Sequence, residues 1–487
     1  MRKSYSTQLR LDSPPIHQVE LNFECRHSII PVLRSLQHVY SKPALTETIM
    51  QMIGRDINGK TSTKRGREGM DYWHILVLAG VRLGCNYTYD EIHDLSENHV
   101  KLRAIMGLGS WDEHTEFKWR TIRDNVCRLS PQTIDEISRL FVAEGHQIDP
   151  DAIKKLRADS FVMETNIHYP TESSLIRDGL RKILEICSEL AVGDGIVGWR
   201  QHHYLWTKVK QLAREIDRIA AKKGPNYVGR MTEPYRELLQ KATLITQRAR
   251  QLSDALTLPN ATAADIFGPN TLQAFIARTE RVIDTATRRI LNGESVPNSD
   301  KLFSVFEPHT QLYKRGKAGE PIQFGRQVLV FEDAAGFIVK SVVMKRNQCD
   351  SGVAIEATKS VQSLFENKVE RLSFDRGFHS PENQRELSKI IPHLCLPKPG
   401  SKQSVVQMAN ADDEFLAAQQ NHPGVESAIG ALQSGNGMER CRDRSELGFE
   451  RYVSLAILGR NMHTLGRMLI AGEAADSVAA STRRNAA

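Results

Sequence analysis

Four short runs rich in β-branched and aromatic residues decide which folds are open to this chain. They read KLFSVFEPH, RQVLVFED, FIVKSVVMK and RLSFD, and lie at residues 301–309, 326–333, 337–345 and 371–375. Each has the composition of a strand, and EDAAGF between the second and third predicts a hairpin turn. Residues 301–400 are therefore predicted to form a sheet, with a last short strand in PHLCLPK at 392–398. Before that strand, SPENQRELSKI predicts a helix with Ser380 as its N-cap and Pro381 in its first turn. A further strand-like run, SFVMETNI, stands far upstream at 160–167.

The segments outside these runs have the hydrophobic spacing of helices. Between residues 171 and 292, apolar residues recur at intervals of four and three, namely Leu205, Val209, Leu212, Ile216 and Ile219, then Leu238, Ala242, Ile245, Ala249, Leu252 and Leu256. The segment KKGPNYVGR between the two series predicts a turn, so the pair should form an antiparallel helical hairpin. A third helix is predicted over 271–291.

Residues 70–108 are predicted to form short helices joined by tight turns. MDYWHILVLAGVRLG reads as a compact apolar helix, Asp90 is available to cap the next one, and EIHDLSENHVKLRAIMGL covers one or two more. Short helices of this kind fit a helix-turn-helix DNA-binding unit, and they fit any small helical bundle equally well.

The positive charge of the chain is concentrated in the predicted hairpin. Residues 201–250 contain eleven Lys and Arg against four Asp and Glu, an excess equal to the net charge of +7 for all 487 residues. Such clustering favours a polyanion partner, whereas the alternative is an ordinary solvated helix face.

Composition excludes several classes of protein. Hydrophobic residues make up 40% of the chain, yet no apolar run approaches the roughly 18 residues of a membrane span. The N-terminal segment lacks the apolar stretch of a secretory signal, so a cytosolic protein without a membrane partner is expected. The seven cysteines include no CxxC pair, which argues against a disulfide framework or a zinc ribbon and predicts buried thiols.

Three carboxylates occupy positions where a site could form. Asp375 ends the run RLSFD and is followed by Arg376, and Asp159 stands just before SFVMETNI or at its first residue. Glu426 lies early on a predicted helix in GVESAIG, and the glycines at 435 and 437 are predicted to interrupt that helix. Each also has an ordinary explanation, respectively a turn, a helix-to-strand junction and a helix N-terminus. Carboxylates without His or Cys suit Mg²⁺ or Mn²⁺, and they are the ligand set of two-metal phosphoryl transfer.

In this order the chain resembles the DDE transposases of bacterial insertion sequences, particularly the ISNCY grouping and its relatives. The matching stretches, which span most of residues 157–467, are RADSFVMETNIHYPTESSLIRDGL, SVFEPHTQLYKRGKAGEPIQFGRQVLV, LSFDRGFHSPENQREL, HPGVESAIGALQ, GMERCRDR and GFERYVSLAILGRNMHTLGR. Some related transposases place a Lys seven residues after the Glu, whereas position 433 here is Gln. DNA-end binding by that Lys therefore does not carry over.

The resemblance implies an α/β fold with an RNase H-like mixed-sheet catalytic core, in which Asp159, Asp375 and Glu426 are the catalytic residues and bind two Mg²⁺ or Mn²⁺ ions. It also implies double-stranded DNA as the partner, both element ends and target, a homodimer or higher oligomer on DNA, and a bacterial, nucleoid-associated location. The expected DNA contacts are Lys208, Lys210, Lys222, Lys223, Lys314, Arg315, Lys317, Arg376, Arg440, Arg442 and Arg444. A solvated basic turn is the alternative for the last three.

The resulting domain layout has four parts. Residues 1–149 form an all-helical N-terminal domain for DNA-end binding, and residues 150–170 with 293–470 form the catalytic core. Residues 171–292 are a helical insertion after the first strand, and 471–487 a disordered tail. The expected function is metal-dependent DNA cleavage and strand transfer at the ends of the element. The alternatives are an RNase H-like nuclease that does not join DNA and a catalytically inactive, transposase-derived DNA-binding protein.

Overall fold

The computed structural model describes residues 4–5, 10–59, 69–193, 199–222, 224–256, 263–314 and 321–485, with only the backbone described at 192–193, 263–269 and 477–485. The chain divides into two compact units. The first consists of Met1–Glu164 and Arg326–Ala487, and the second of Thr165–Gly325. Sequence segments on both sides of the second unit therefore meet in the first.

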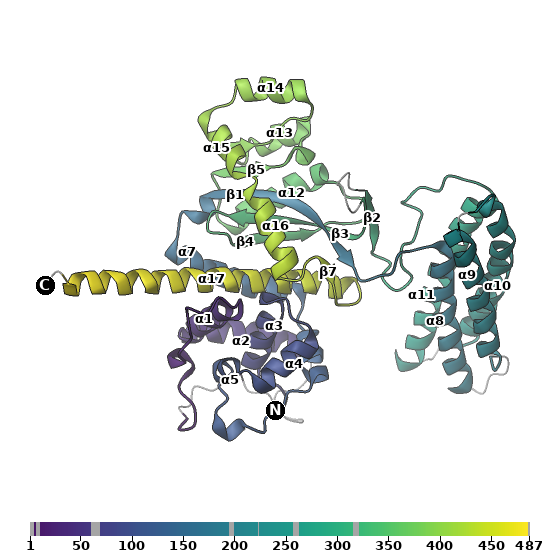
Figure 1. Cartoon of the computed structure of the whole chain (residues 1–487), viewed down its shortest axis with the longest axis horizontal. Helices are drawn as coiled ribbons and strands as arrows, with labels where there is room; N and C mark the ends of the chain where they lie inside the picture. The colour runs from purple at the N-terminus through teal and green to yellow at the C-terminus, as the bar shows by residue number, and fades with distance from the viewer. Residues whose placement is uncertain are drawn as a thin grey trace. The chain divides into compact units, whose positions relative to one another are not determined.

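A mixed sheet carries the α/β character of the fold (Figure 1). Its strands are β1 (Lys155–Thr165), β2 (Gln311–Lys314), β3 (Ile322–Asp333), β4 (Ile338–Val343), β5 (Arg371–Phe374), β6 (His393–Cys395) and β7 (Arg440–Cys441). The order is β2-β3-β1-β5-β6, with β4 paired to β3 and β7 to β1. β1, β5 and β6 are parallel, whereas β3 is antiparallel to both β2 and β4. The predicted α/β class with a mixed sheet is confirmed.

Most of the predicted strands are confirmed, and two predictions are wrong. β3, β4, β5 and β6 lie where the β-rich runs predicted them, and Gly336 closes the β3–β4 hairpin at a φ of 88°. Residues 301–309 contain no strand, because Leu302 and Val305 are buried as irregular chain in the core of the second unit. Asp159 lies inside β1 and not at its start, because β1 begins at Lys155, four residues earlier. The charged residues Lys155 and Arg157 did not suggest a strand, although this stretch pairs with β5.

The second unit contains a bundle of long helices. These are α8 (Glu172–Gly193), α9 (His202–Lys222), α10 (Tyr227–Leu256) and α11 (Ala263–Ala286), followed by a π-helical turn at Thr287–Leu291. The apolar residues of both predicted series, apart from the half-buried Ile219, are buried between the helices or packed against that core, which confirms the α9–α10 hairpin. The bundle follows β1 directly, as a helical insertion after the first strand requires.

The described residues before β1 form helices and no strand. The helices are α1 (Ile29–Tyr40), α2 (Pro43–Asn58), α3 (Tyr72–Gly84), α4 (Tyr89–Asn98), α5 (Val100–Ile105), α6 (Trp119–Val126) and α7 (Pro131–Ile148). The cap of α4 is Thr88 and not Asp90, because the Thr88 hydroxyl accepts from the Glu91 amide while the Glu91 carboxylate accepts from the Thr88 amide.

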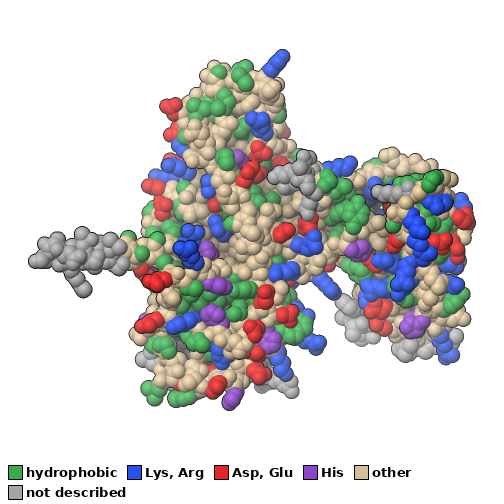
Figure 2. Space-filling model, in the orientation of Figure 1, with side chains coloured by type: hydrophobic (Ala, Val, Ile, Leu, Met, Phe, Trp, Pro, Cys, Tyr) green, Lys and Arg blue, Asp and Glu red, His purple; other side chains and the backbone are tan. Residues whose placement is uncertain are grey.

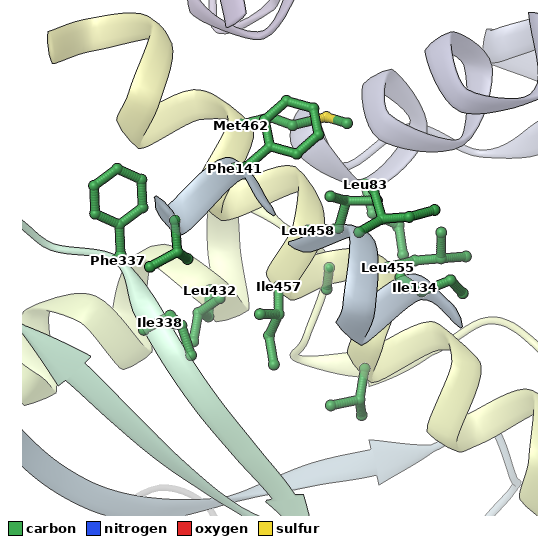
Figure 3. Packing of buried hydrophobic residues seen from close by; sticks show 14 of the residues in the cluster. Leu83, Ile134, Phe141, Phe337, Ile338, Leu432, Leu455, Ile457, Leu458 and Met462 are labelled. Carbon is green, nitrogen blue, oxygen red and sulfur yellow. The ribbon is translucent and has the colours of Figure 1, made fainter. Parts of the chain in front are cut away.

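A long C-terminal helix packs against these N-terminal helices and the sheet. α17 (Glu446–Asn485) contacts α1, α3 and α7, and the buried cluster joins Leu83, Phe141, Phe337 and Leu458 (Figure 3). Residues 471–485, predicted to be disordered, continue this helix. Nucleating a helix is the unfavourable step, and the first half of α17, which is packed against the other helices, provides that nucleus. The Ala-rich second half then extends an existing helix, which Ala favours.

The remaining helices surround the parallel half of the sheet. They are α12 (Asp350–Leu364), α13 (Pro381–Leu387), α14 (Ser401–Ala409), α15 (Asp413–Asn421) and α16 (Gly424–Gly435). α13 begins as predicted, with Pro381 at its first turn and the Ser380 hydroxyl accepting from the Asn383 amide.

Two properties of the whole chain complete the description. No helix in the described ranges is both long and apolar enough to cross a bilayer. Cys187, Cys395 and Cys441 are buried, but Cys25 and Cys349 are exposed, so the prediction of buried thiols fails at these two positions, which lie on loops outside the core.

Candidate functional site

Two neighbouring parallel strands bring Asp159 and Asp375 together. The register of β1 and β5 pairs Leu156 with Leu372 and Ala158 with Phe374, so each aspartate directly follows the last residue through which these two strands pair with each other. Parallel strands in this register place consecutive residues at the same level of the sheet. Asp375 then caps the 3-10 turn Arg376–Phe378, which leads the chain away from β5. The strand therefore ends on a carboxylate that lies beside another.

Glu426 reaches the same place from a helix. It occupies the first turn of α16 and is exposed, as is Asp375, whereas Asp159 is partly buried. Burial, and then the charges of Asp375, Asp350 and Glu426, together raise the pKa of Asp159 to about 6, although a hydrogen bond from the Ser160 amide lowers it. Because the charges of Asp375 and Glu426 both act on Asp159, the three predicted carboxylates belong to one cluster.

A fourth carboxylate, Asp350, belongs to this cluster and was missed by the sequence reasoning. Its Oδ1 accepts hydrogen bonds from Ser160 Oγ at 2.6 Å and Gln327 Nε2 at 2.7 Å. Gln327 Nε2 also donates to Ser160 Oγ at 2.6 Å, so the three side chains form a closed network beside Asp159. The sequence held no signal for this role, since an Asp at the start of a helix is ordinary.

His422 stands next to the exposed members of the cluster. Its Nδ1 lies 3.1 Å from Ser373 Oγ on β5. Burial lowers the pKa of His422, while the charges of Asp375 and Glu426 act to raise it. The net direction favours a neutral imidazole beside the carboxylates.

Arg157 holds the start of α16 against the sheet. It lies two residues before Asp159 on β1, so both side chains leave the strand on the same face. Its Nε donates to the buried Glu332 carboxylate at 2.6 Å, and its Nη1 donates to the Asn421 carbonyl at 3.2 Å. Arg157 thereby ties β1 and β3 to the chain that leads into the helix of Glu426.

The predicted DNA-contacting side chains fall into different surroundings. Arg376 is exposed directly after Asp375, with Nη2 3.5 Å from Ser404 Oγ. Arg440 pairs with Glu164 at 2.7 Å. Arg442 donates to the Tyr452 hydroxyl and to Asn86, so its hydrogen bonds lie within the protein. Arg444 and Lys314 are exposed.

The basic residues of the helical hairpin lie in the second unit. Lys210 and Lys222 are exposed on α9, and Lys208 is half-buried with its Nζ 5.7 Å from the centre of the Tyr204 ring. Figure 2 shows Lys and Arg side chains gathered on the visible face of the bundle. Lys223, Arg315 and Lys317 lie outside the described residues.

The chemistry of the cluster fits a hard divalent cation. All its charged donors are carboxylate oxygens, and their mutual repulsion, seen in the raised pKa of Asp159, is relieved by a bound cation. Within the described ranges, no three His, Cys, Asp or Glu side chains converge closely enough to hold a metal ion. Binding would therefore require the exposed side chains of Asp375 and Glu426 to change rotamer.

Comparison of the chain with protein-family models, with curated proteins and with solved structures found no match. The functional assignment therefore depends on the carboxylate cluster, the strand order and the charge distribution. The charge distribution is independent of the other two features, because the basic residues lie on α9 and α10 whereas the carboxylates and the strand order depend on β1 and β5.

Proposed function

We propose that this chain is a DDE transposase that cleaves DNA strands at the ends of its own element and joins them to target DNA. One observation carries the proposal. Asp159 and Asp375, 216 residues apart in sequence, directly follow the last residues through which the adjacent parallel strands β1 and β5 pair, and Glu426 lies close enough to act on the pKa of Asp159. Active-site carboxylates of open α/β sheets belong at the carboxyl ends of strands, where Asp375 lies.

The strand order supports an RNase H-like core. β1 is central, with the antiparallel β3–β4 hairpin on one side and the parallel strands β5 and β6 on the other. The two strands that carry Asp159 and Asp375, β1 and β5, are therefore neighbours at the centre of the sheet, as the RNase H-like core that we propose requires.

In the proposed mechanism Asp159, Asp375 and Glu426 would hold two Mg²⁺ ions. The ions supply activation of a water or a 3′-hydroxyl and stabilisation of the leaving oxygen in an in-line displacement. Asp350 keeps Ser160 and Gln327 in a fixed network next to Asp159. Arg157 fixes the entry to the helix of Glu426, and Arg376 presents a cation to a phosphate beside Asp375.

The charge of the second unit supports DNA as the partner. Residues 201–250, which include α9 and most of α10, carry a positive excess equal to that of the whole chain, and most of their described Lys and Arg side chains are exposed. Phosphate contacts from such side chains hold a duplex irrespective of its sequence. The proposal therefore separates a duplex-binding surface from the carboxylates that perform the chemistry.

The deciding experiment uses the purified chain, DNA carrying the element ends, and Mg²⁺. Asp375→Asn should abolish cleavage and strand transfer while binding of the ends changes less than about twofold, since an amide keeps the shape and loses the charge that holds a cation. Asp151→Asn, which alters an exposed aspartate outside the cluster, is the matched control and should retain activity. Full activity of Asp375→Asn would remove the residue from the site.

The products of the same reaction separate the alternatives. Nicked or cleaved ends without joined products would indicate a nuclease. Stable binding of the ends without metal-dependent cleavage would indicate a DNA-binding protein that has lost catalysis.

A further inference from the structure

A large cavity opens next to the strand end that carries Asp375. Its volume is about 1040 Å³, and it lies between α13, the end of β6, α14 and α15, which Figure 1 shows grouped beside β5. The residues of interest in its lining are His379, Gln384, Lys398, Lys402, Val406 and Phe415. His379 lies four residues after Asp375, so the cavity and the carboxylate cluster share one loop.

Two residues of the lining carry buried polar atoms without partners. His379 Nε2 and Gln384 Oε1 have almost no accessible surface and make no hydrogen bond among the described residues, so each side chain would turn toward the cavity to meet a ligand. Burial and the neighbouring Lys398 both lower the pKa of His379, so its ring is neutral and can donate or accept. A buried polar atom left unpaired is costly, and a ligand that pairs with both atoms removes the cost.

The rest of the lining has two other chemistries. Phe415 is half-buried and offers an aromatic face, and Val406 is 61% exposed although it is apolar. Lys398 and Lys402 are exposed at the rim and carry positive charge. The cavity thus has an aromatic ring for stacking, an amide and an imidazole side chain with unpaired atoms, and two lysines at its rim.

Contacts from α14 connect the cavity wall to the chain after β6 and to Arg376, which follows Asp375. Gln407 on α14 accepts from the Lys398 amide at 2.8 Å and donates to the Leu396 carbonyl at 3.1 Å. Ser404 on the same helix lies 3.5 Å from Arg376. An occupant of the cavity would therefore be held at a set position relative to Asp375.

We propose that this cavity binds one unpaired deoxynucleotide of the DNA strand that the carboxylate cluster acts on. Aromatic faces stack on a base, amide and imidazole groups pair with its free edge, and lysines contact the flanking phosphates. A base inside a duplex has both its faces and its pairing edge already occupied, so only an unpaired one fits. This proposal rests on the proposed function, because it takes the DNA strand from there.

The test measures binding without metal, so that it does not depend on cleavage. The probe is a duplex with a three-nucleotide single-stranded extension that contains 2-aminopurine, whose fluorescence is quenched by stacking. The wild-type chain should quench the extension, and Phe415→Ala should abolish the quenching and weaken its binding by about tenfold. Tyr169→Ala, which removes an exposed aromatic side chain outside the cavity, is the control and should behave as the wild type.

Val406→Trp tests whether the effect of Phe415→Ala comes from a folding defect, and a double lysine variant tests the charge at the rim. Val406→Trp fills the cavity from an exposed helix position, so it should fold normally and still prevent quenching. Lys398→Ala with Lys402→Ala should weaken binding of the extended duplex more than of a blunt one. Lys101→Ala with Lys368→Ala removes the same charge elsewhere on the first unit and should affect both duplexes alike.

The outcomes separate this proposal from the proposed function. Equal quenching by the wild type, Phe415→Ala and Val406→Trp would overturn the cavity assignment even in a chain that cuts and joins DNA. If quenching depends on Phe415 but the chain shows no metal-dependent cleavage, the cavity assignment would stand and the transposase function would be refuted. Competition by free 2-aminopurine deoxynucleoside monophosphate as strong as that of the extended strand would make the ligand a free nucleotide and overturn the strand assignment.

Discussion

The guanidinium of Arg157 on β1 occupies the space where a side chain at Gly424 on α16 would begin. A Cβ atom built at position 424 would overlap Arg157 Nη1. Gly424 is thus required by close approach, and it lies two residues before Glu426. The contact connects the strand of Asp159 to the helix of the third carboxylate.

Gly424→Ala should therefore displace either Arg157 or α16. We expect a loss of about 1–3 kcal/mol of stability in urea unfolding, together with a larger loss of cleavage than of DNA binding. Gly430→Ala on the same helix is the matched control, because a Cβ there meets no atom within 4 Å. It should raise stability by about 0.5–1 kcal/mol. Similar behaviour of the two variants would contradict the packing argument.

Glu426, and not Glu439, should be the third catalytic carboxylate. α16 ends at Gly435, and Gly437 has a φ of 74°, so the helix is interrupted before Glu439, whose carbonyl pairs with the Glu164 amide. Glu426→Gln should abolish cleavage, and Glu439→Gln should leave it within about twofold. Cleavage assays with both variants on one substrate decide this, and the reverse result would move the site to β7.

Asp159 should make the metal-free protein less stable as the pH rises. Folding raises its pKa from 3.8 to about 6, so between these pH values the folded state binds more protons than the unfolded state and stability falls with rising pH. Relative to wild type, Asp159→Asn should gain up to about 2 kcal/mol on going from pH 4 to pH 7. Urea unfolding at several pH values measures the difference.

The control for this titration is Asp151, whose pKa is shifted in the opposite direction to that of Asp159. The pKa of Asp151 is lowered by its hydrogen bond to Lys154, so its contribution to stability is present at pH 7 and disappears as the pH falls. Asp151→Asn should therefore show no gain at pH 7. Mg²⁺ should stabilise the wild type at pH 7 more than Asp159→Asn, and equal stabilisation of both would argue against Asp159 as a ligand.

The basic hairpin should determine how strongly DNA binding depends on salt. Neutralising Lys208, Lys210, Lys222 and Lys223 together should reduce the slope of log affinity against log salt by up to roughly 3 to 4 units, about 0.9 for each lost phosphate contact. Lys208 is half-buried beside Tyr204, so it is expected to contribute least of the described three.

Binding in this variant should weaken equally for all DNA sequences, because phosphate contacts do not read bases. Folding should survive, with each change on the exposed helix surface costing less than about 0.5 kcal/mol. Affinity measured at several salt concentrations on two unrelated duplexes tests both points. An unchanged slope in the folded variant would leave the hairpin as a structural insertion with a solvated face.

Local patterns in the sequence determined the elements that carry the candidate site. Alternating β-branched residues predicted β3 to β5, the Ser380–Pro381 pair predicted the start of α13, and the glycines near 435 predicted the end of α16. Each of these signals depends on a few neighbouring residues, because dihedral preferences and capping bonds act within one or two turns of chain.

The sequence was less informative wherever burial came from distant segments. Residues 301–309 have the composition of a strand, yet tertiary packing buries Leu302 and Val305 without one. The start of β1 was not predicted as strand, because its two buried apolar residues, Leu156 and Ala158, alternate with the charged Lys155 and Arg157 and its pairing partner β5 lies more than two hundred residues away. Residues 471–485 are helical because they continue a helix whose earlier turns are buried against the N-terminal helices.

Only the tertiary structure decided that the carboxylates meet. The parallel pairing of residues 155–158 with 371–374 crosses more than two hundred residues and sets Asp159 beside Asp375, and the Arg157–Gly424 contact brings α16 to them. Asp350 enters the cluster through hydrogen bonds to β1 and β3 that no local pattern encodes. Sequence identifies which residues are able to bind a cation, whereas long-range strand register determines which of them lie close enough to act together.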